Sequence, residues 1–125
     1  MTENINVSIG ELWDKYSILL IKQEKIDNDD ELKYINKELE YLSNNMKKYD
    51  FAKDYLFIEL KATNITLWDI EDKIRIKEAK QQFDDEFIKL ARSVYIINDK
   101  RAYFKKRINN KFNSLIHEVK YYKSY

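Results

Sequence analysis

The chain contains no cysteine, no proline and a single glycine, Gly10, among its 125 residues. Without cysteine it can form neither a disulfide nor a thiolate metal site, and its one histidine, His117, excludes any site that needs two imidazoles. The scarcity of proline and glycine removes the residues that favour tight turns. The chain is therefore expected to consist of long helices, and its length fits one domain over residues 1–125.

Long apolar runs are also absent. No stretch approaches the ~18 apolar residues that a membrane span requires. The first residues, MTENINVSIG, lack the basic segment and the apolar run of a secretion signal. We therefore expect a cytoplasmic protein without a membrane partner. No strand pattern competes with the helical interpretation, and no cofactor is predicted.

The net charge is close to zero, but acidic and basic residues are unevenly distributed. From Lys100 to the end there are eight Lys or Arg against Glu118 alone, whereas the remainder carries 15 basic and 21 acidic residues. Two explanations stay open: the basic end meets an anionic partner, or the last helix packs beside acidic helices of its own chain. In the basic end, tyrosines alternate with lysines, a pattern that could bind nucleic acid. The near-neutral charge of the chain and the lack of a known nucleic-acid-binding motif argue against that partner.

Apolar residues recur at three- and four-residue spacing, the pattern of amphipathic helices, in four segments. Ser8 and Glu11 form a capping-box pattern at the start of the first segment, whose apolar stripe ends at Ile26. The polar run over residues 28–30 separates it from a second segment over residues 32–46. The short turn predicts that these two helices are antiparallel.

The third segment is predicted as one long helix from about Phe51 to Lys80, because its apolar stripe keeps its phase through Thr63. The fourth stripe runs from Phe87 to Leu115. The sequence thus predicts an all-α fold, a four-helix bundle-like domain with long third and fourth helices. Residues 1–7 and 118–125 are expected to be frayed.

Both tryptophans lie in Leu-Trp-Asp triplets, at residues 12–14 and 67–69. At an offset of 55 residues the two regions also match at residues 21–22 and 76–77, but they do not match in between, which argues against an internal duplication. We give the second triplet the greater functional weight, because Glu71 and Asp72 follow it directly. The first is interpreted as a polar flank on an apolar stripe.

Carboxylates three residues apart lie on one helix face and could hold Mg²⁺, as in helical nucleotide pyrophosphohydrolases. Nearby lysines and arginines can neutralise these carboxylates instead, so a salt-bridged face is the favoured interpretation and no metal is predicted. The carboxylates concerned are Glu11, Asp14, Asp69 and Asp72.

Arg101 stands where the fourth stripe requires Leu or Ile. An unpaired buried guanidinium is very costly, so it must meet a carboxylate, reach solvent or face a polar pocket. Glu71 or Asp72 is the predicted partner. The ion pair could simply fix helix register, or the seam between the third and fourth helices could bind an anionic small molecule. Candidate ligand-binding residues are Glu71, Asp72, Arg75, Arg92, Asn98, Asp99, Arg101 and Lys105.

Three stretches, VSIGELWDKYSILLIKQEKI (7–26), LWDIEDKIR (67–75) and FIKLARSVYIINDKRAYFKKRIN (87–109), resemble a family of small bacterial and phage-associated proteins of unknown function. The resemblance implies a compact helical domain, sometimes found in glycosyltransferase contexts, without an assigned activity. At the position of Trp13 an aliphatic residue is more usual in that family. A looser likeness to helical chorismate mutases is one of architecture only.

Three functions stay open. The first is the anion-binding seam, and the sequence names no catalytic residue for it. The second is a non-catalytic interaction module or homodimer, because the first helix carries more apolar residues than a single stripe needs, namely Trp13, Ile18, Leu20 and Ile21. The third is nucleic-acid binding through the basic end.

Overall fold

The computed structural model describes all 125 residues and contains helices but no strand. This confirms the all-α prediction and the greater length of the third and fourth helices. No helix combines the length and the apolar character needed to cross a membrane. The elements are α1 (Ile9–Lys25), α2 (Asp29–Met46), the 3-10 turn η1 (Phe51–Lys53), α3 (Tyr55–Ala79) and α4 (Asp85–Lys111).

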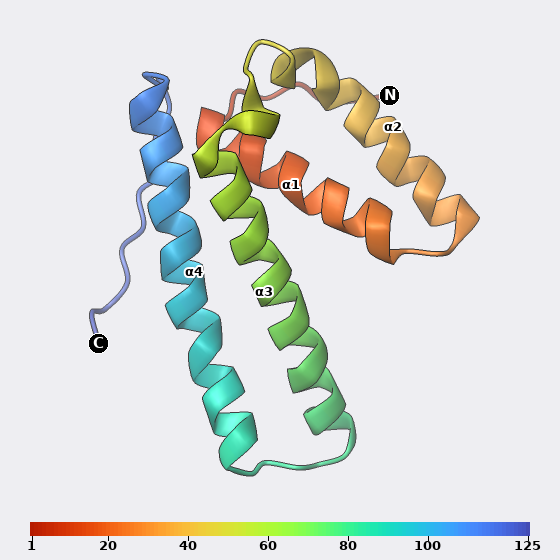
Figure 1. Cartoon of the computed structure of the whole chain (residues 1–125), viewed down its shortest axis with the longest axis vertical. Coiled ribbons are helices and arrows are strands. Elements are labelled where there is room, and N and C mark those ends of the chain that lie inside the picture. The colour runs from red at the N-terminus through yellow and green to blue at the C-terminus, as the bar shows by residue number, and fades with distance from the viewer.

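The helices form two antiparallel hairpins of unequal length (Figure 1). The longer hairpin consists of α3 and α4. The shorter hairpin, α1 with α2, packs near one end of it through α1, so that α1 contacts all three other helices and α2 lies outermost. The other end of the α3–α4 hairpin, residues 66–97, projects beyond α1 and α2; we call this projection the arm.

Side-chain caps start every α-helix. Ser8 accepts a hydrogen bond from the Glu11 amide at 3.0 Å, as predicted, but the Glu11 carboxylate does not complete the capping box. The third helix begins at Tyr55 rather than Phe51, because residues 51–53 form a separate turn and Asp54 caps the helix through the Leu56 amide. Asn28 and Asp84 cap α2 and α4.

The fourth helix ends at Lys111, which makes the predicted end at Leu115 wrong. Asn113 adopts a positive φ of 53°, a left-handed conformation that terminates helices and that asparagine tolerates. Beyond it the Leu115 side chain is fully exposed. The apolar period therefore continued by coincidence past the point where the backbone turns.

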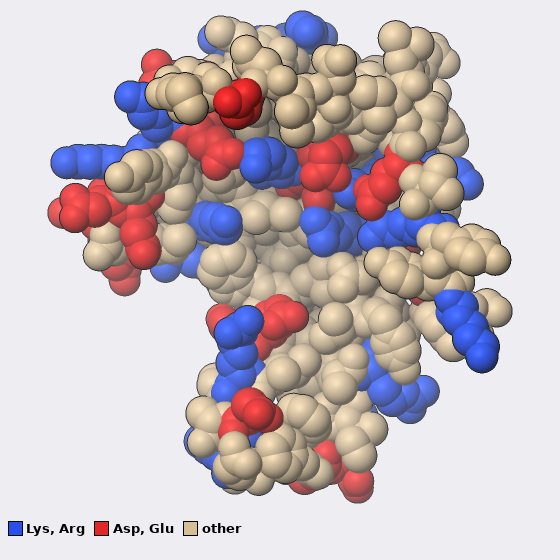
Figure 2. Space-filling model, turned by 180° about the vertical axis from the view of Figure 1, so that it is seen from behind, with Lys and Arg blue, Asp and Glu red and all other residues tan.

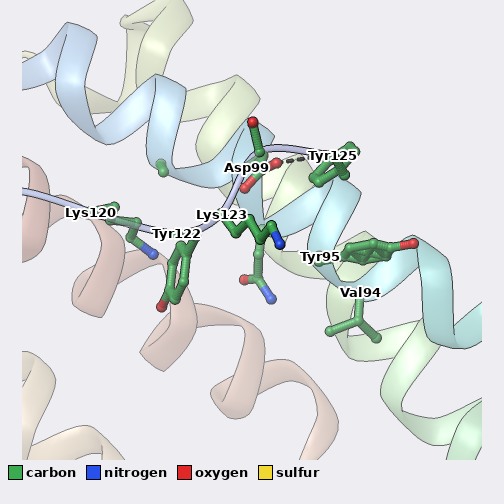
Figure 3. Close-up of a pocket in the computed structure, with 10 residues that line it drawn as sticks. Val94, Tyr95, Asp99, Lys120, Tyr122, Lys123 and Tyr125 are labelled. Atoms are coloured by element: carbon green, nitrogen blue, oxygen red, sulfur yellow. Dashed lines mark hydrogen bonds between the residues drawn. The ribbon is translucent and has the colours of Figure 1, made fainter.

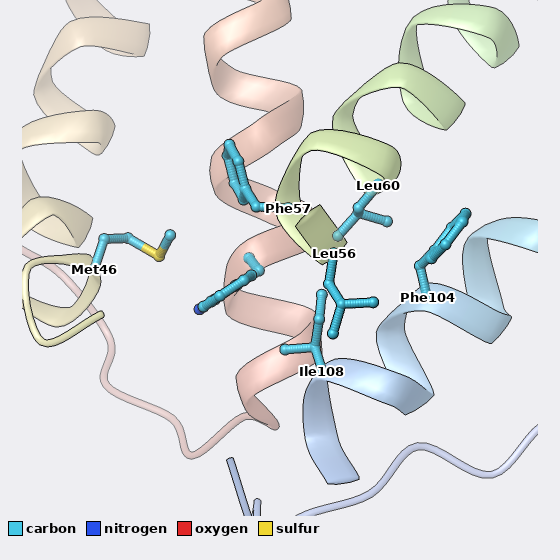
Figure 4. Packing of buried hydrophobic residues seen from close by; sticks show 7 residues of the cluster. Met46, Leu56, Phe57, Leu60, Phe104 and Ile108 are labelled. Carbon is cyan, nitrogen blue, oxygen red and sulfur yellow. The ribbon is translucent and has the colours of Figure 1, made fainter. Parts of the chain in front are cut away.

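The main hydrophobic core lies where α1 crosses the α3–α4 hairpin (Figure 4). Trp13 is fully buried at its centre, with edge-on or tilted contacts to Tyr49, Phe57 and Phe112 at 5.1–5.8 Å between ring centroids. Its indole N–H has no hydrogen-bond partner, so the residue contributes through packing alone. The cluster comprises Trp13, Met46, Leu56, Phe57, Leu60, Phe104 and Ile108.

Replacing Trp13 by alanine should lower the free energy of unfolding by about 3–5 kcal/mol, the usual cost of removing a buried aromatic side chain. Urea unfolding followed by circular dichroism measures this change. Trp68→Ala is the matched control, because Trp68 is only half-buried at the base of the arm. An equal loss in the two variants would contradict the placement of the core.

Candidate functional site

One buried carboxylate joins three helices. Asp14 on α1 has a side chain that is 1% exposed. Arg101 on α4 donates to it through two nitrogens, from Nε to Oδ1 at 3.0 Å and from Nη2 to Oδ2. Asn64 on α3 donates from Nδ2 to the same Oδ1 at 2.9 Å. The forked guanidinium contact and the amide together neutralise and bind the carboxylate, which burial requires.

The surrounding polar atoms are also satisfied. Asn64 Nδ2 donates to Ser17 Oγ at 2.8 Å, and Ser17 Oγ donates to the backbone oxygen of Asp14 at 2.7 Å. No buried side-chain oxygen or nitrogen in this region lacks a partner. A fully bonded network of this kind specifies one arrangement of the helices.

Lys105, one turn beyond Arg101, extends the network. Its Nζ lies 2.7 Å from Glu11 Oε2, 2.8 Å from Glu118 Oε2 and 3.8 Å from Asp14 Oδ2, and its side chain is only 8% exposed. Three carboxylates thus surround two cations, which gives the cluster a net charge of −1. We call Glu11, Asp14, Arg101, Lys105 and Glu118 the charge cluster.

Contacts within the charge cluster shift the pKa of Arg101, Lys105 and Glu118 in the directions that ion pairing predicts. Hydrogen bonding to Asp14 raises the pKa of Arg101 above its ordinary value, although burial opposes the shift. Burial lowers the pKa of Lys105, but the contacts with Glu11 and Glu118 outweigh it and the net change is upward. Pairing with Lys105 lowers the pKa of the Glu118 carboxyl. Each of these three shifts favours the charged form of its group.

The first turn of α1 is held directly against α4. The Gly10 amide donates to Asn109 Oδ1 at 2.6 Å, and the Ile9 amide donates to Ser114 Oγ at 3.1 Å. A Cβ atom on Gly10 would lie 2.5 Å from the backbone oxygen of Lys105. Only glycine fits this approach, which explains where the chain uses its single glycine.

The predicted partners of Arg101 were wrong. Glu71 and Asp72 are exposed on the arm, where Glu71 lies 3.6 Å from Arg75. Arg101 lies level with Asn64, since both bind the same oxygen of Asp14, and Glu71 is seven residues further along α3, roughly 10 Å at 1.5 Å per residue. The partner comes instead from α1, which crosses the hairpin at that level.

The eight candidate ligand-binding residues do not meet in one cavity. Arg101 and Lys105 lie in the charge cluster, while Arg92 is exposed on the arm, as are Glu71, Asp72 and Arg75. Asn98 and Asp99 line a different feature, an open pocket between α4 and the residues after it. A ligand for any of them stays a prediction.

The prediction gave the second Leu-Trp-Asp triplet the greater weight, but the structure places the first triplet at the centre of the fold. Trp13 and Asp14 of the first are buried, whereas Asp69 of the second is exposed and lies 3.9 Å from Lys25. The four carboxylates considered for Mg²⁺ lie in two separate places: Glu11 and Asp14 in the charge cluster, and Asp69 and Asp72 exposed on the arm. No group of three or more His, Asp or Glu side chains is placed to hold a metal. A signal was present: Asp14 shares a helix face with Ser17 and Ile21, at three- and four-residue spacing.

The chain is thus an all-helical protein in which a buried ion pair joins α1 to the α3–α4 hairpin. It belongs to a family of unknown function, DUF6165, whose sequence profile matches residues 3–125. This confirms the expectation that the chain belongs to a family of unknown function, and the match covers nearly the whole chain. Comparisons with curated proteins and with solved structures give no match.

The ion pair should show a strong and unequal response to mutation. Arg101→Met leaves the buried Asp14 carboxylate without its guanidinium and should cost about 3–5 kcal/mol. Asp14→Asn should cost less, because the Arg101 side chain is already 28% exposed and can reach water. The double variant should lose about 1–3 kcal/mol less free energy of unfolding than the sum of the two single-variant losses. Urea unfolding of the four proteins measures this coupling; additive losses would contradict it.

Gly10→Ala should destabilise the protein by about 1–3 kcal/mol, the range for forcing an extra carbon into a packed contact, even though alanine is the better helix former. Lys15→Ala, at an exposed position of the same helix, is the control and should change stability by less than about 0.5 kcal/mol. Thermal unfolding of both variants tests the prediction, and a Gly10→Ala protein as stable as the parent would refute it.

Proposed function

We propose that this chain is a protein-interaction module that pairs with a second copy of itself through the arm. The observation that carries the proposal is the burial along residues 66–97. Ile70 is the only buried residue in this range, although the arm continues the apolar stripes of α3 and α4. Side chains that would form a core in a wider bundle remain half-exposed, including Ile76, Phe83, Ile88 and Tyr95.

The uncovered surface continues a face that is already used for packing. On α4 this face has the regular spacing 88, 91, 95, 98, 102, 105 and 109. At its upper end Lys105 and Asn109 contact α1, whereas Ile88 and Ala91 at its lower end are exposed. A two-helix hairpin with an uncovered face completes a four-helix bundle when a second hairpin packs on it.

The corresponding face of α3 carries Asn64, Trp68, Glu71 and Arg75, again at three- and four-residue spacing. Asn64 binds α1 through Asp14, and the residues below it extend down the arm. Both helices therefore present the side on which α1 lies, and α1 covers its upper part. On α4, the residues that follow the helix border the middle of this face, where the Tyr125 ring contacts Tyr95.

The order of residues on this face favours a second copy as the occupant. We consider two arms that pack antiparallel about a two-fold axis near Ala91. Ile88 stands three residues before Ala91 and Tyr95 four residues after it, so Ile88 of one copy lies opposite Tyr95 of the other. In the same way, Glu71 of each copy lies opposite Arg75 of the other, which brings opposite charges together. Such reciprocity is what a symmetric interface requires. The small side chain of Ala91 permits close approach of the helices.

The net charge of the arm supports this choice. Between residues 66 and 97 there are seven acidic and six basic residues, so two arms do not repel each other strongly. The space-filling view shows the arm as a narrow projection, with acidic and basic side chains interspersed on the visible face of the molecule rather than gathered in one patch (Figure 2).

The other two candidate functions have less support. Two of the four cations of the predicted seam, Arg101 and Lys105, are already matched by carboxylates of the charge cluster. Lys111, a further basic residue at the end of α4, lies 2.7 Å from Asp54. These pairs favour the explanation that the basic last helix complements acidic residues of its own chain over one that requires a nucleic acid.

Sedimentation equilibrium over micromolar to millimolar concentrations should show a dimer. Ala91→Arg puts bulk and charge at the centre of the proposed interface and should weaken dimerisation by about tenfold or more. Ala91 is exposed in the single chain, so its fold should survive, as circular dichroism will check. Ile96→Lys is the matched control, because Ile96 lies on the opposite side of α4. Its side chain is 44% exposed, close to the 41% of Tyr95 on the proposed interface.

A charge exchange tests the antiparallel arrangement itself. Glu71→Arg alone should weaken the dimer, and the double variant Glu71→Arg with Arg75→Glu should restore it. A parent protein that stays monomeric at the highest concentration, or a loss of dimer in Ile96→Lys equal to that in Ala91→Arg, would refute the proposal.

A further inference from the structure

After α4 the chain turns at Asn113 and runs back beside the helix without secondary structure (Figure 1). We call residues 112–125 the tail. Near its start Ser114 accepts from the Ile9 amide, and in its middle Glu118 pairs with Lys105. At its end the Tyr125 hydroxyl donates to Asp99 Oδ2 at 2.5 Å. The tail is thus attached to the folded part at three separated points.

Between the second and third attachments, the tail and α4 enclose an open pocket of about 730 Å³. This volume lies within the range of roughly 300–1,000 Å³ found for small-molecule sites. Helix α4 contributes Tyr95, Asn98 and Asp99 to its lining, and the tail contributes Tyr122, Lys123 and Tyr125 (Figure 3).

The lining has two chemical features. Three tyrosine rings, of Tyr95, Tyr122 and Tyr125, offer flat apolar surfaces, and the Tyr95 and Tyr125 rings already meet edge-on at 5.1 Å between centroids. Two lysines, Lys120 and Lys123, outnumber the single carboxylate side chain, Asp99, so the lining side chains carry a net charge of +1. Aromatic faces bind planar rings, and an ammonium group binds anions.

The lysines differ in what they contact. Lys120 Nζ lies 3.9 Å from Glu118 and 5.9 Å from the centroid of the Tyr122 ring. The Lys123 side chain instead lies beside α4, near Asp99 and Tyr95 (Figure 3), and no carboxylate side chain lies within ion-pair distance of it. Lys123 is therefore the cation best placed to meet a bound anion.

We propose that this pocket binds a planar aromatic molecule that carries an anionic group, either a phosphate or a carboxylate. The ring lies among the tyrosines and the anion meets Lys123. Glu118 acts as a positioning residue: it does not line the pocket, but its ion pair with Lys105 fixes the part of the tail that enters it. The proposal does not depend on pairing through the arm, although Tyr95 belongs to both surfaces.

Isothermal titration calorimetry with four probes tests the proposal: adenosine monophosphate, salicylate, adenosine and inorganic phosphate. At least one aromatic anion should bind more tightly than both adenosine and phosphate, and the first two probes tell a phosphate from a carboxylate preference. The titrations are repeated in the Ala91→Arg protein, so that loss of the proposed dimer and loss of the pocket are distinguishable.

Lys123→Gln should weaken binding of that aromatic anion by about tenfold, since it removes one charge-assisted contact. Lys33→Gln on the exposed side of α2 is the control and should leave binding unchanged. Glu118→Gln should also weaken binding, without any loss of a group that touches the ligand.

Several results would overturn the proposal. One is that neither aromatic anion binds at millimolar concentration. Others are that phosphate or adenosine binds as tightly as the aromatic anions, that Lys123→Gln binds like the parent, or that a chain ending at Ile116 keeps full affinity.

Discussion

The structure depends on one constraint: a carboxylate that is almost completely buried must be neutralised and hydrogen-bonded where it lies. Asp14 meets this requirement only if Arg101 and Asn64 reach it together, and the three residues come from three helices. The level at which α1 crosses the α3–α4 hairpin is thereby fixed. The close approach of Gly10 to α4, and the position of Lys105 between Glu11 and the tail, follow from that crossing.

The molecule divides into a base that is held by many interactions and an arm that is held by few. In the base, the aromatic core around Trp13 and the charge cluster lie on neighbouring sides of α1, so packing and ion pairing support the same helix arrangement. The arm has a single buried residue, Ile70, and local stability generally follows burial. An element of this kind gains most from a partner, and this links its poor burial to the interaction proposed for it.

The sequence was sufficient for the helices because each apolar stripe keeps a regular period, and it indicated that Arg101 needs a carboxylate because a charge interrupts that period. It could not identify Asp14 as the partner. A period defines which face of a helix is buried, but not which helix crosses that face or at what level. Gly10 was the clearest missed signal, since a lone glycine in a first helical turn suggests close contact. The tail has no period, so its contacts could not be predicted at all.

The contacts that hold α1 in place also join distant parts of the chain. Asp14 and Arg101 are 87 residues apart, and Gly10 and Asn109 are 99 apart. Local helix pairs form quickly, whereas contacts between such distant residues must overcome the entropy of closing a long loop, and they slow folding. During synthesis α1 and α2 emerge first, with the Asp14 carboxylate still in water. The amino-terminal helix can therefore reach its final position only when nearly the whole polypeptide has been made, and a truncated chain lacks the cation that lets this helix become buried.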